Sequence, residues 1–270
     1  MGTHFENEAE WVSSALLSAR LEHAALLRLL LKKKILQPEE LLSELSALAS
    51  DEYVFNLKQF VAQSETQLRN GRWHIGGAKA TDQLGRRLAL GPDDSVLDIG
   101  CGIGGPARQI AETFGSSVVG VDHRFDRILE AMLRTAVLGM NLRISFHVAD
   151  GEHLPFEEET FEAVVSQATL NWIPDKPAAI REAFRALKPR GRFGFECEAM
   201  TEKAITLRHE EPTGLFRILG WQQLLAVAGF AEVEIEEMWD ESRLFYPTGP
   251  EREQMDQGER VNVRMMARKP

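Results

Sequence analysis

The stretch Ser95-Val-Leu-Asp-Ile-Gly-Cys-Gly-Ile-Gly-Gly105 decides the fold of this chain. It predicts a short apolar strand over residues 95–99, then a glycine-rich turn, then an amphipathic helix over residues 106–114. Glycine is needed in such a turn because a ligand approaches the backbone there, and Cβ atoms would obstruct it. A second predicted strand, residues 117–121, leads into Asp122, whose carboxylate is placed to accept hydrogen bonds from a ribose diol. The segment therefore predicts a nucleoside-binding pocket at a helix amino terminus.

Two classes of ligand fit the glycines alone. Residues 100–105 match the G-x-G-x-x-G pattern of nicotinamide and flavin enzymes, in which the turn binds a pyrophosphate. Asp98, two residues before the first glycine, would crowd a pyrophosphate with negative charge. The same carboxylate suits a ligand that carries an ammonium and a sulfonium group. Asp98 therefore favours the second class, and a nicotinamide-dependent oxidoreductase is the alternative.

Three later motifs are more specific than the glycines. They are Val148-Ala-Asp-Gly-Glu-His-Leu-Pro-Phe156, Phe161-Glu-Ala-Val-Val-Ser-Gln-Ala-Thr-Leu-Asn-Trp172 and Glu182-Ala-Phe-Arg-Ala-Leu-Lys-Pro-Arg-Gly-Arg-Phe193. Together with the glycine turn, they make residues 73–270 resemble the class I S-adenosylmethionine-dependent methyltransferases. The resemblance implies S-adenosyl-L-methionine as cofactor, S-adenosyl-L-homocysteine as product, and a small molecule as methyl acceptor.

Apolar and helical segments alternate along the chain after residue 73. Candidate parallel strands cover residues 95–99, 117–121, 144–148, 162–167 and 191–197, and this alternation predicts a doubly wound α/β sheet. The tail differs, because two strands, residues 231–238 and 261–267, follow each other with only a loop between them. This pattern predicts an antiparallel pair, and members of the resembled family end in this way. We therefore expect a Rossmann-like, mostly parallel seven-stranded sheet with an antiparallel last strand.

Residues 1–72 precede this catalytic domain, residues 73–270, and are predicted to be helical. Apolar side chains recur at three- and four-residue steps from Val12 to Leu30. Pro38 begins a second helical segment, and a third follows it. We interpret the region as an N-terminal helical cap on the catalytic domain. A homodimer contact through the stripe from Val12 to Leu30 is the alternative, and the two are compatible.

The composition excludes several classes of partner. A net charge of −10 argues against a broad nucleic-acid surface, which needs clustered Lys and Arg. No run of about 18 apolar residues occurs, and residues 1–11 are acidic and polar, so neither a membrane span nor a signal peptide is expected. The two cysteines, Cys101 and Cys197, cannot form a disulfide framework, which favours a cytoplasmic protein, and they do not support a metal site.

The resemblance assigns the cofactor site residue by residue. It implies that the glycine turn and the carboxylate before it hold the methionyl part, and that Asp122 binds the ribose. It also implies that Asp150 accepts a hydrogen bond from the adenine amine, although Asp-Gly is an ordinary turn signal as well. His123 either covers the adenine or is solvated. The predicted cofactor residues are Asp98, Gly100, Gly102, Gly104, Asp122, His123, Asp150, Gly151 and Gln167.

The methyl acceptor is expected beyond the carboxyl end of the fourth strand, because open α/β sheets bind ligands at that edge. Asn171 and Trp172 are the predicted contacts there, and a plain core role is the alternative for Trp172. Methyl transfer from a sulfonium needs mainly in-line alignment and exclusion of water, so only an acceptor that carries a proton requires a base. The predicted bases are His74, Glu196 and Glu198. The two glutamates share a strand face, and solvated acidic residues are the alternative for them.

The segment of residues 72–77 precedes the first predicted helix of the catalytic domain. It resembles the segment with which related small-molecule methyltransferases cover the cofactor, and its two glycines suit a hinge. Trp73 is therefore a predicted acceptor contact, and a fixed approach to the helix is the alternative. After this loop, Thr81 or Asp82 is expected to cap a helix over residues 83–89.

These observations predict a metal-independent methyltransferase that acts on a small molecule. The cluster of Glu196, Glu198 and Glu202 favours an amine or another cation-forming acceptor. Residues 167–176 and 188–193 also resemble enzymes that methylate carboxylates or alkenyl carbons, so the acceptor stays open. A non-catalytic cofactor-binding protein that associates through its N-terminal helices is the alternative from another class.

Overall fold

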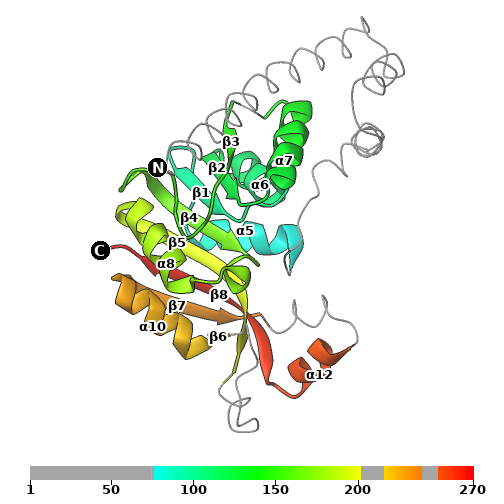
Figure 1. Cartoon of the computed structure of the whole chain (residues 1–270), viewed down its shortest axis with the longest axis vertical. Helices are drawn as coiled ribbons and strands as arrows, with labels where there is room; N and C mark the ends of the chain where they lie inside the picture. Colours follow the sequence, from blue (N-terminus) through cyan, green and yellow to red (C-terminus); the bar gives the residue numbers. More distant parts are fainter. Residues whose placement is uncertain (1–73, 75, 141, 202–215, 239–248) are drawn as a thin grey trace, which may run out of the picture.

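The computed structural model describes residues 74, 76–140, 142–201, 216–238 and 249–270. In this part of the chain, strands form one sheet in the order β3-β2-β1-β4-β5-β8-β7, and the short β6 pairs with β5 outside that path (Figure 1). The strands are β1 (Ser95–Ile99), β2 (Ser117–Asp122), β3 (Ile144–Val148), β4 (Phe161–Gln167), β5 (Leu187–Met200), β6 (Phe216–Arg217), β7 (Ala231–Glu237) and β8 (Arg260–Arg268). The helices are α5 (Gly77–Arg87), α6 (Gly105–Phe114), α7 (Phe125–Leu138), α8 (Lys176–Ala186), α10 (Ile218–Ala228) and α12 (Pro250–Asp256), with a 3-10 turn, η1 (Leu170–Trp172). The predicted helical cap, the stripe from Val12 to Leu30 and Trp73 lie outside the described residues.

The first five strands run parallel to one another. The connections from β1 to β2, from β2 to β3 and from β4 to β5 each contain a helix, as parallel neighbours require. The parallel strands are short and mostly apolar, which is typical of a sheet whose two faces are both covered by helices. The chain builds β1, β2 and β3 outward in one direction and then returns to place β4 on the other side of β1. The doubly wound prediction is confirmed, and the junction of β1 and β4 is its topological switch point.

Helices form a layer on each face of the sheet (Figure 1). One face carries α8 and α10 over a core that includes Phe161, Val164 and Trp221. The other carries α5, α6 and α7 over a core that includes Leu84 and Val165. Successive residues of a strand point to opposite faces. Beyond the register shift between Phe161 and Ala163, Ala163 and Val165 of β4 therefore face α5, and Val164 faces α8. Among the described residues, no helix combines the length and the apolar character needed to span a membrane.

The last strand, β8, runs antiparallel to β5 on one side and to β7 on the other. This pairing confirms the predicted antiparallel end of the sheet. Residues 261–267 of β8 are all buried because the strand lies between two neighbours and beneath helices. β7 forms one edge of the sheet in the described part of the chain, opposite the edge formed by β3, and four of its seven residues are glutamate. Charge on an edge strand disfavours pairing with further strands.

Three local predictions were wrong. α5 begins at Gly77 rather than at residue 83, so Thr81 lies inside the helix and caps nothing. Thr81 is fully buried, and its hydroxyl contacts other buried polar side chains, which a local capping pattern cannot distinguish from a cap. β5 begins at Leu187 rather than at residue 191 because Leu187 already pairs with Phe161. The loop expected between the last two strands contains α12.

Candidate active site

The glycine turn lies at the switch point, between the carboxyl end of β1 and the amino end of α6. Gly100 donates its N–H to the carbonyl of Val121 at 2.8 Å, and Gly102 donates to Oδ2 of Asp122 at 3.1 Å. Gly104 is the N-cap of α6, with φ +79°, and no side chain caps the helix there. The turn is therefore attached to β2, while the amino terminus of α6 presents N–H groups to a ligand.

The three predicted glycines of the turn are required for two different reasons. All have positive φ, which favours glycine. A Cβ at Gly100 would lie 2.1 Å from the side chain of Thr169, and one at Gly104 would lie 2.6 Å from the ring of Phe146. A Cβ at Gly102 would meet nothing within 4 Å. Protein atoms thus exclude side chains at the first and third glycines, whereas Gly102 leaves the backbone open to a ligand.

Asp98 is a buried carboxylate at the carboxyl end of β1. It is 1% exposed, and its Oδ2 atom is buried without a hydrogen-bond partner in the part of the chain that the structure describes. Burial raises the pKa of Asp98 to about 7, and the charge of Asp122 contributes to that rise. A buried acceptor without a partner costs free energy, and a cationic donor would remove that cost. Asp98 and the open backbone at Gly102 therefore fit a ligand with an ammonium group.

Asp122 ends β2 and faces the glycine turn. Its Oδ2 accepts from Gly102, and its Oδ1 accepts the N–H of Arg124 at 3.0 Å. The guanidinium of Arg127 lies 3.6 Å from Oδ2. Each carboxylate oxygen has a second lone pair, so Asp122 retains capacity to accept from a diol. The neighbouring His123 side chain is 75% exposed, and its Nδ1 lies 3.6 Å from Oδ1 of Asp122.

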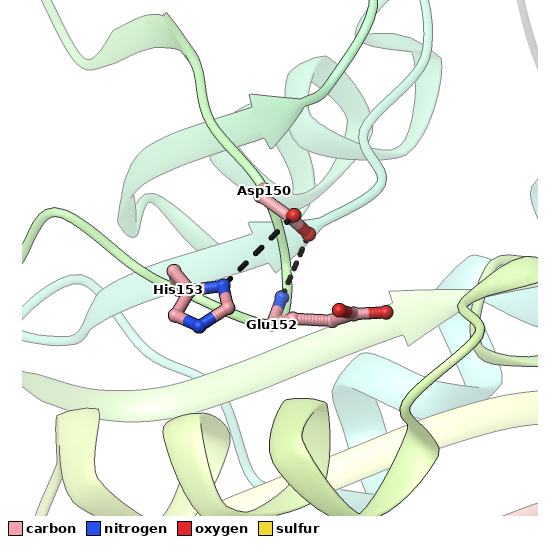
Figure 2. A group of neighbouring side chains, drawn as sticks. All are labelled: Asp150, Glu152 and His153. Carbon is pink, nitrogen blue, oxygen red and sulfur yellow. Dashed lines mark hydrogen bonds and ion pairs between the residues drawn. The ribbon is translucent and has the colours of Figure 1, made fainter. Parts of the chain in front are cut away.

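Asp150, Glu152 and His153 gather in the turn after β3 (Figure 2). Oδ1 of Asp150 accepts the N–H of Glu152 at 2.9 Å, and Oδ2 lies 4.0 Å from Nδ1 of His153. The Glu152 side chain extends away from that pair and accepts the N–H of Asp175 at 2.8 Å. Potential metal-ligand atoms of the three residues lie within 4.8 Å of one another. The two carboxylates are already engaged with backbone N–H groups, and the Asp150 side chain is 59% exposed at the edge predicted for adenine.

Gln167, Glu196 and His74 form a buried polar group at the same edge of the sheet. Nε2 of Gln167 donates to Oε2 of Glu196 at 2.6 Å, and Oε1 accepts from the Thr81 hydroxyl at 3.0 Å. His74 lies against both, with Nε2 3.2 Å from Oγ1 of Thr81 and Nδ1 3.5 Å from Nε2 of Gln167. Burial raises the pKa of Glu196, and the guanidinium of Arg264 opposes that rise from 2.7 Å. The predicted base Glu196 thus lies inside the protein with a partner for each oxygen.

Glu198 lies two residues further along β5, on the same face as Glu196. Oδ1 of Asn171 accepts the N–H of Glu198 at 3.1 Å, and Nδ2 of Asn171 donates to its carbonyl at 2.8 Å. The Asn171 amide therefore replaces a strand partner after β4 has ended. Oε2 of Glu198 pairs with Arg260, whereas Oε1 is buried without a partner. Trp172 is 83% exposed, so it does not belong to the described core.

The structure gathers most of the predicted cofactor residues at the carboxyl ends of three adjacent strands. These are Asp98, Gly100, Gly102, Gly104, Asp122, Asp150 and Gly151. A Cβ at Gly151 would lie 3.1 Å from Ile99 of β1, so packing also favours glycine there. Gln167 points toward α5, and His123 toward solvent. The cofactor, acceptor and catalytic roles of these residues stay predictions.

The sequence analysis missed Arg264, Thr81 and Gln83 as part of this edge. Arg264 is 1% exposed, and it donates to Glu196 at 2.7 Å and to Gln83 at 3.1 Å. The available signal was an arginine within the apolar run of residues 261–267, because a buried charge must be paired. The sequence does not reveal the partners, which lie 68 and 181 residues away along the chain.

A family model described as a methyltransferase domain matches residues 97–195. Phosphoethanolamine N-methyltransferase 1 of Zea mays is 32% identical to this chain over 177 residues, 64% of this chain and 35% of the relative. Methyltransferase GfsG of Streptomyces halstedii is 30% identical over 185 residues, 64% of this chain and 65% of the relative. The chain thus spans about a third of the maize protein and just under two thirds of GfsG.

One solved structure of the same fold is the geranyl diphosphate C-methyltransferase from Streptomyces coelicolor A3(2), in complex with Mg2+, geranyl diphosphate and S-adenosyl-L-homocysteine. It matches this chain with a TM-score of 0.63 and 19% identity, over 72% of this chain and 78% of that one. At this identity the likeness shows a shared fold, which agrees with the sheet order described above.

Proposed function

The chain belongs to the class I S-adenosylmethionine-dependent methyltransferases, and we propose that it transfers a methyl group from S-adenosyl-L-methionine to a small organic molecule. The observation that carries the proposal is the buried Oδ2 of Asp98, which has no hydrogen-bond partner among the described residues, at the same edge of the sheet as the open backbone at Gly102. A negatively charged acceptor in that position attracts an ammonium group and repels a pyrophosphate. The site therefore favours the sulfonium cofactor over a nicotinamide.

The cofactor roles follow from the edge at which each residue lies. Asp98 would accept hydrogen bonds from the ammonium group, and the amino terminus of α6 would face the carboxylate of the methionyl part. Asp122 would bind the ribose hydroxyls, and Asp150 would accept from the adenine amine. When bound, S-adenosyl-L-methionine supplies a methyl group that its sulfonium already activates.

The remaining residues would contribute alignment and exclusion of water. Both carboxylate oxygens of Glu196 have partners, so we propose that Glu196 positions Gln167 and Arg264 and does not act as a base. The two ring nitrogens of His74 are engaged by Thr81 and Gln167, so we assign His74 a positioning role as well. Glu198, with one oxygen that has no partner among the described residues, is then the candidate for a base, which only an acceptor with a proton to lose requires. We propose that the reaction needs no metal ion, since sulfonium chemistry needs no Lewis acid.

An amine is the acceptor class that the described residues favour. The exposed indole of Trp172 follows Asn171, which is bonded to the backbone of Glu198. An aromatic face and a carboxylate together suit a group that becomes cationic on methylation. The name of the maize relative specifies phosphoethanolamine, an amine, whereas the S. coelicolor structure holds geranyl diphosphate, a prenyl compound. Both classes belong in the test.

The test combines calorimetry with a methyl-transfer screen. S-adenosyl-L-homocysteine and NAD are titrated into the protein, and label from methyl-labelled cofactor is followed into amines, thiols, phenols, carboxylates and prenyl diphosphates, with and without EDTA. We expect S-adenosyl-L-homocysteine to bind, NAD not to bind, and label to enter an amine in both conditions. Binding of NAD alone would overturn the proposal. Cofactor binding without transfer would support the non-catalytic alternative, and loss of transfer in EDTA would contradict metal independence.

We also propose that residues 1–72 form a helical cap over the acceptor side of the catalytic domain. The predicted cofactor residues all follow residue 73, so deletion of residues 1–49 should leave cofactor affinity within a few fold while it lowers turnover sharply. Calorimetry and methyl transfer on the same soluble sample check this. Full turnover of the truncated protein would contradict the cap and leave a homodimer contact as the better account of the stripe from Val12 to Leu30.

A further inference from the structure

Four polar side chains stand in one row across the sheet, one on each of β4, β5, β8 and β7. The strand register places Gln167 opposite Glu196, Glu196 opposite Arg264, and Arg264 opposite Glu236. The row lies on the face covered by α5, because Gln167 has the same parity as Val165 in the core beneath that helix. We call these four residues the polar row.

On β4, β5 and β8 the row immediately behind the polar row is apolar, whereas its member on β7 is the exposed Glu234. Val165 pairs with Gly194, and Gly194 pairs with Met266, all of them buried. Leu84 and Leu88 of α5 fill the space over Gly194, since a Cβ there would lie 2.8 Å from each of their side chains. The contacts between the sheet and the middle of α5 are thus apolar. At the carboxyl edge of the sheet, charged and polar groups take their place.

The polar row costs more to bury than apolar side chains of the same size would. Glu196 and Arg264 are each 1% exposed, and apolar replacements for such a pair are often neutral or stabilising. The donors of Arg264 are nevertheless directed at three different acceptors: Glu196 at 2.7 Å, Glu236 at 2.9 Å and Gln83 at 3.1 Å. Directed contacts of this kind determine position more than they determine stability.

One end of the polar row leads into the candidate active site. Gln167 is the last residue of β4, and the next residue, Ala168, has φ +55° and donates its N–H to the carbonyl of Glu196 at 2.9 Å. The hydroxyl of Thr169 then donates to the carbonyl of Gly100, at 3.1 Å. Two hydrogen bonds therefore connect the polar row to the glycine turn.

The same end of the polar row also holds His74, which precedes α5. If the Thr81 hydroxyl donates to Gln167, its oxygen accepts from Nε2–H of His74, and Nδ1 of His74 then accepts from the Gln167 amide. Between His74 and α5 the chain turns at Gly76 and Gly77, whose φ values are +80° and +53°. Two glycines would give this segment freedom, which the hydrogen bonds to Gln167 remove.

We propose that Arg264 is a positioning residue for methyl transfer. It holds Glu196 and, through Gln167, fixes His74 and the first turns of α5 against the carboxyl ends of β4 and β5. Arg264 acts only through these neighbours. The kinetic part of this inference rests on the proposed function, whereas the structural part is measurable without any acceptor.

A second ion pair of β5 provides a matched control. Arg192 lies near the amino end of the strand, where it pairs with Asp94 and donates to the carbonyls of Leu88 and Ala89 at 2.7 and 2.9 Å. It therefore ties the carboxyl end of α5 to the opposite edge of the sheet. If ion pairs only held the helix in place, loss of Arg192 and loss of Arg264 would have the same effect on turnover.

The test uses the full chain with three variants: Arg264→Lys, Arg192→Met, and the double variant Glu196→Leu with Arg264→Met. The double change is chosen because Arg264→Met alone would leave a buried, unpaired carboxylate and endanger folding. For each protein we would measure the melting temperature, S-adenosyl-L-homocysteine affinity, kcat and KM with an accepted amine, and hydrogen exchange of residues 74–87 and 105–114.

We expect the double variant to melt near the wild-type temperature, with kcat lower by about tenfold or more because the reacting groups are less well aligned. Its acceptor KM should change little, and residues 74–87, but not 105–114, should exchange faster. Arg264→Lys should recover part of the kcat, and Arg192→Met should lower the melting temperature and leave kcat unchanged. A stable double variant with wild-type kcat and exchange would overturn the inference. Wild-type protein that transfers no methyl would overturn the proposed function, and exchange of residues 74–87 would then decide the structural part.

Discussion

Two carboxylates at the carboxyl edge of the sheet, Asp98 on β1 and Glu196 on β5, meet opposite surroundings. Each is 1% exposed, and burial raises the pKa of each. Glu196 has an amide and a guanidinium on its two oxygens. Oδ2 of Asp98 has no partner among the described residues, and the charge of another carboxylate, Asp122, raises the pKa of Asp98 further. The difference separates two uses of a buried charge. A carboxylate with all its partners belongs to the scaffold, and one that lacks a partner is suited to a ligand.

The same contrast distinguishes the cofactor side of the site from the side formed by β4 and β5. On the cofactor side, the glycine turn has open space at Gly102 and a carboxylate that lacks a partner. On the side of β4 and β5, Gln167, Glu196 and Arg264 satisfy one another. Substitutions on the cofactor side should therefore change binding, and substitutions in the polar row should change stability or turnover.

The largest effect is expected from Gly102→Val. A β-branched side chain at φ +54° is strained, and it would fill the space through which a ligand reaches the backbone. S-adenosyl-L-homocysteine binding should be lost, with the fold retained, as judged by calorimetry and circular dichroism. Gly249→Val is the control, because Gly249 also has positive φ, and a Cβ there would meet only the Glu251 side chain, at an ordinary contact distance of 3.7 Å. Normal cofactor binding by a folded Gly102→Val protein would show that the turn is not part of the pocket.

Asp98→Asn should weaken S-adenosyl-L-homocysteine binding by about 100-fold, the loss of a charge-assisted hydrogen bond of 2 to 3 kcal/mol. The same change should raise the melting temperature of the ligand-free protein, because it removes a buried charge that has no partner.

Glu196→Gln is the matched control for that pair of effects. It leaves Arg264 buried without its closest counter-charge, so the melting temperature should fall while cofactor affinity changes little. Calorimetry and thermal melts on both variants check the comparison. Shifts of the same sign in the two melting temperatures would refute the distinction between the two carboxylates.

The cofactor half could be predicted from the sequence because its signals are local. β1 and β3 occupy the predicted residues, since each is a short apolar run bounded by turn residues. Asp98 and Asp122 follow from their places at strand ends next to glycines. Residues at the ends of parallel strands are placed by the residues next to them in the sequence, because parallel strands all end at the same edge of the sheet.

The other half could not be predicted because its contacts are distant along the chain. Glu196 was predicted as a base, with a solvated acidic residue as the alternative, and its partner Arg264 lies 68 residues away along the chain. Thr81 has the local pattern of an N-cap, yet its hydroxyl bonds to Gln167, 86 residues away. Arg264 lies within the apolar run of residues 261–267, which is a signal of burial. That run does not reveal the strand register that pairs Arg264, because register is a property of the folded sheet.

A smaller effect is expected from Asp122→Ala. The carboxylate is predicted to bind the ribose diol, and loss of one hydrogen bond to a charged group of about 1.5 kcal/mol weakens binding about tenfold. Titration of S-adenosyl-L-homocysteine measures the change. Because Asp122 also accepts from Gly102 and Arg124, Asp122→Asn is the control, since its single amide oxygen retains an acceptor for one of these two N–H groups. Unchanged affinity of Asp122→Ala would contradict the ribose assignment.

The smallest effect is a dependence of cofactor affinity on pH. In the free protein the pKa of Asp98 is raised to about 7, so half of the molecules carry a proton there at neutral pH. An ammonium group favours the carboxylate form, which means that binding releases the proton. Affinity for S-adenosyl-L-homocysteine should therefore rise with pH by at most about tenfold per unit below 7 and level off above it.

The stability of the free protein should change in the opposite direction over the same range. The folded pKa of Asp98 lies above its ordinary value of 3.8, so the folded chain holds a proton that the unfolded chain loses between that value and about 7. This carboxyl group therefore stabilises the fold less as pH rises through that window. Calorimetry at pH 6, 7 and 8, in buffers of different ionisation enthalpy, measures the released proton, and thermal melts measure the stability. Asp98→Asn should abolish both dependences. Wild-type affinity that is equal at pH 6 and pH 8 would show that Asp98 is already ionised in the free protein, and the contrast with Glu196 would then rest on hydrogen bonding alone.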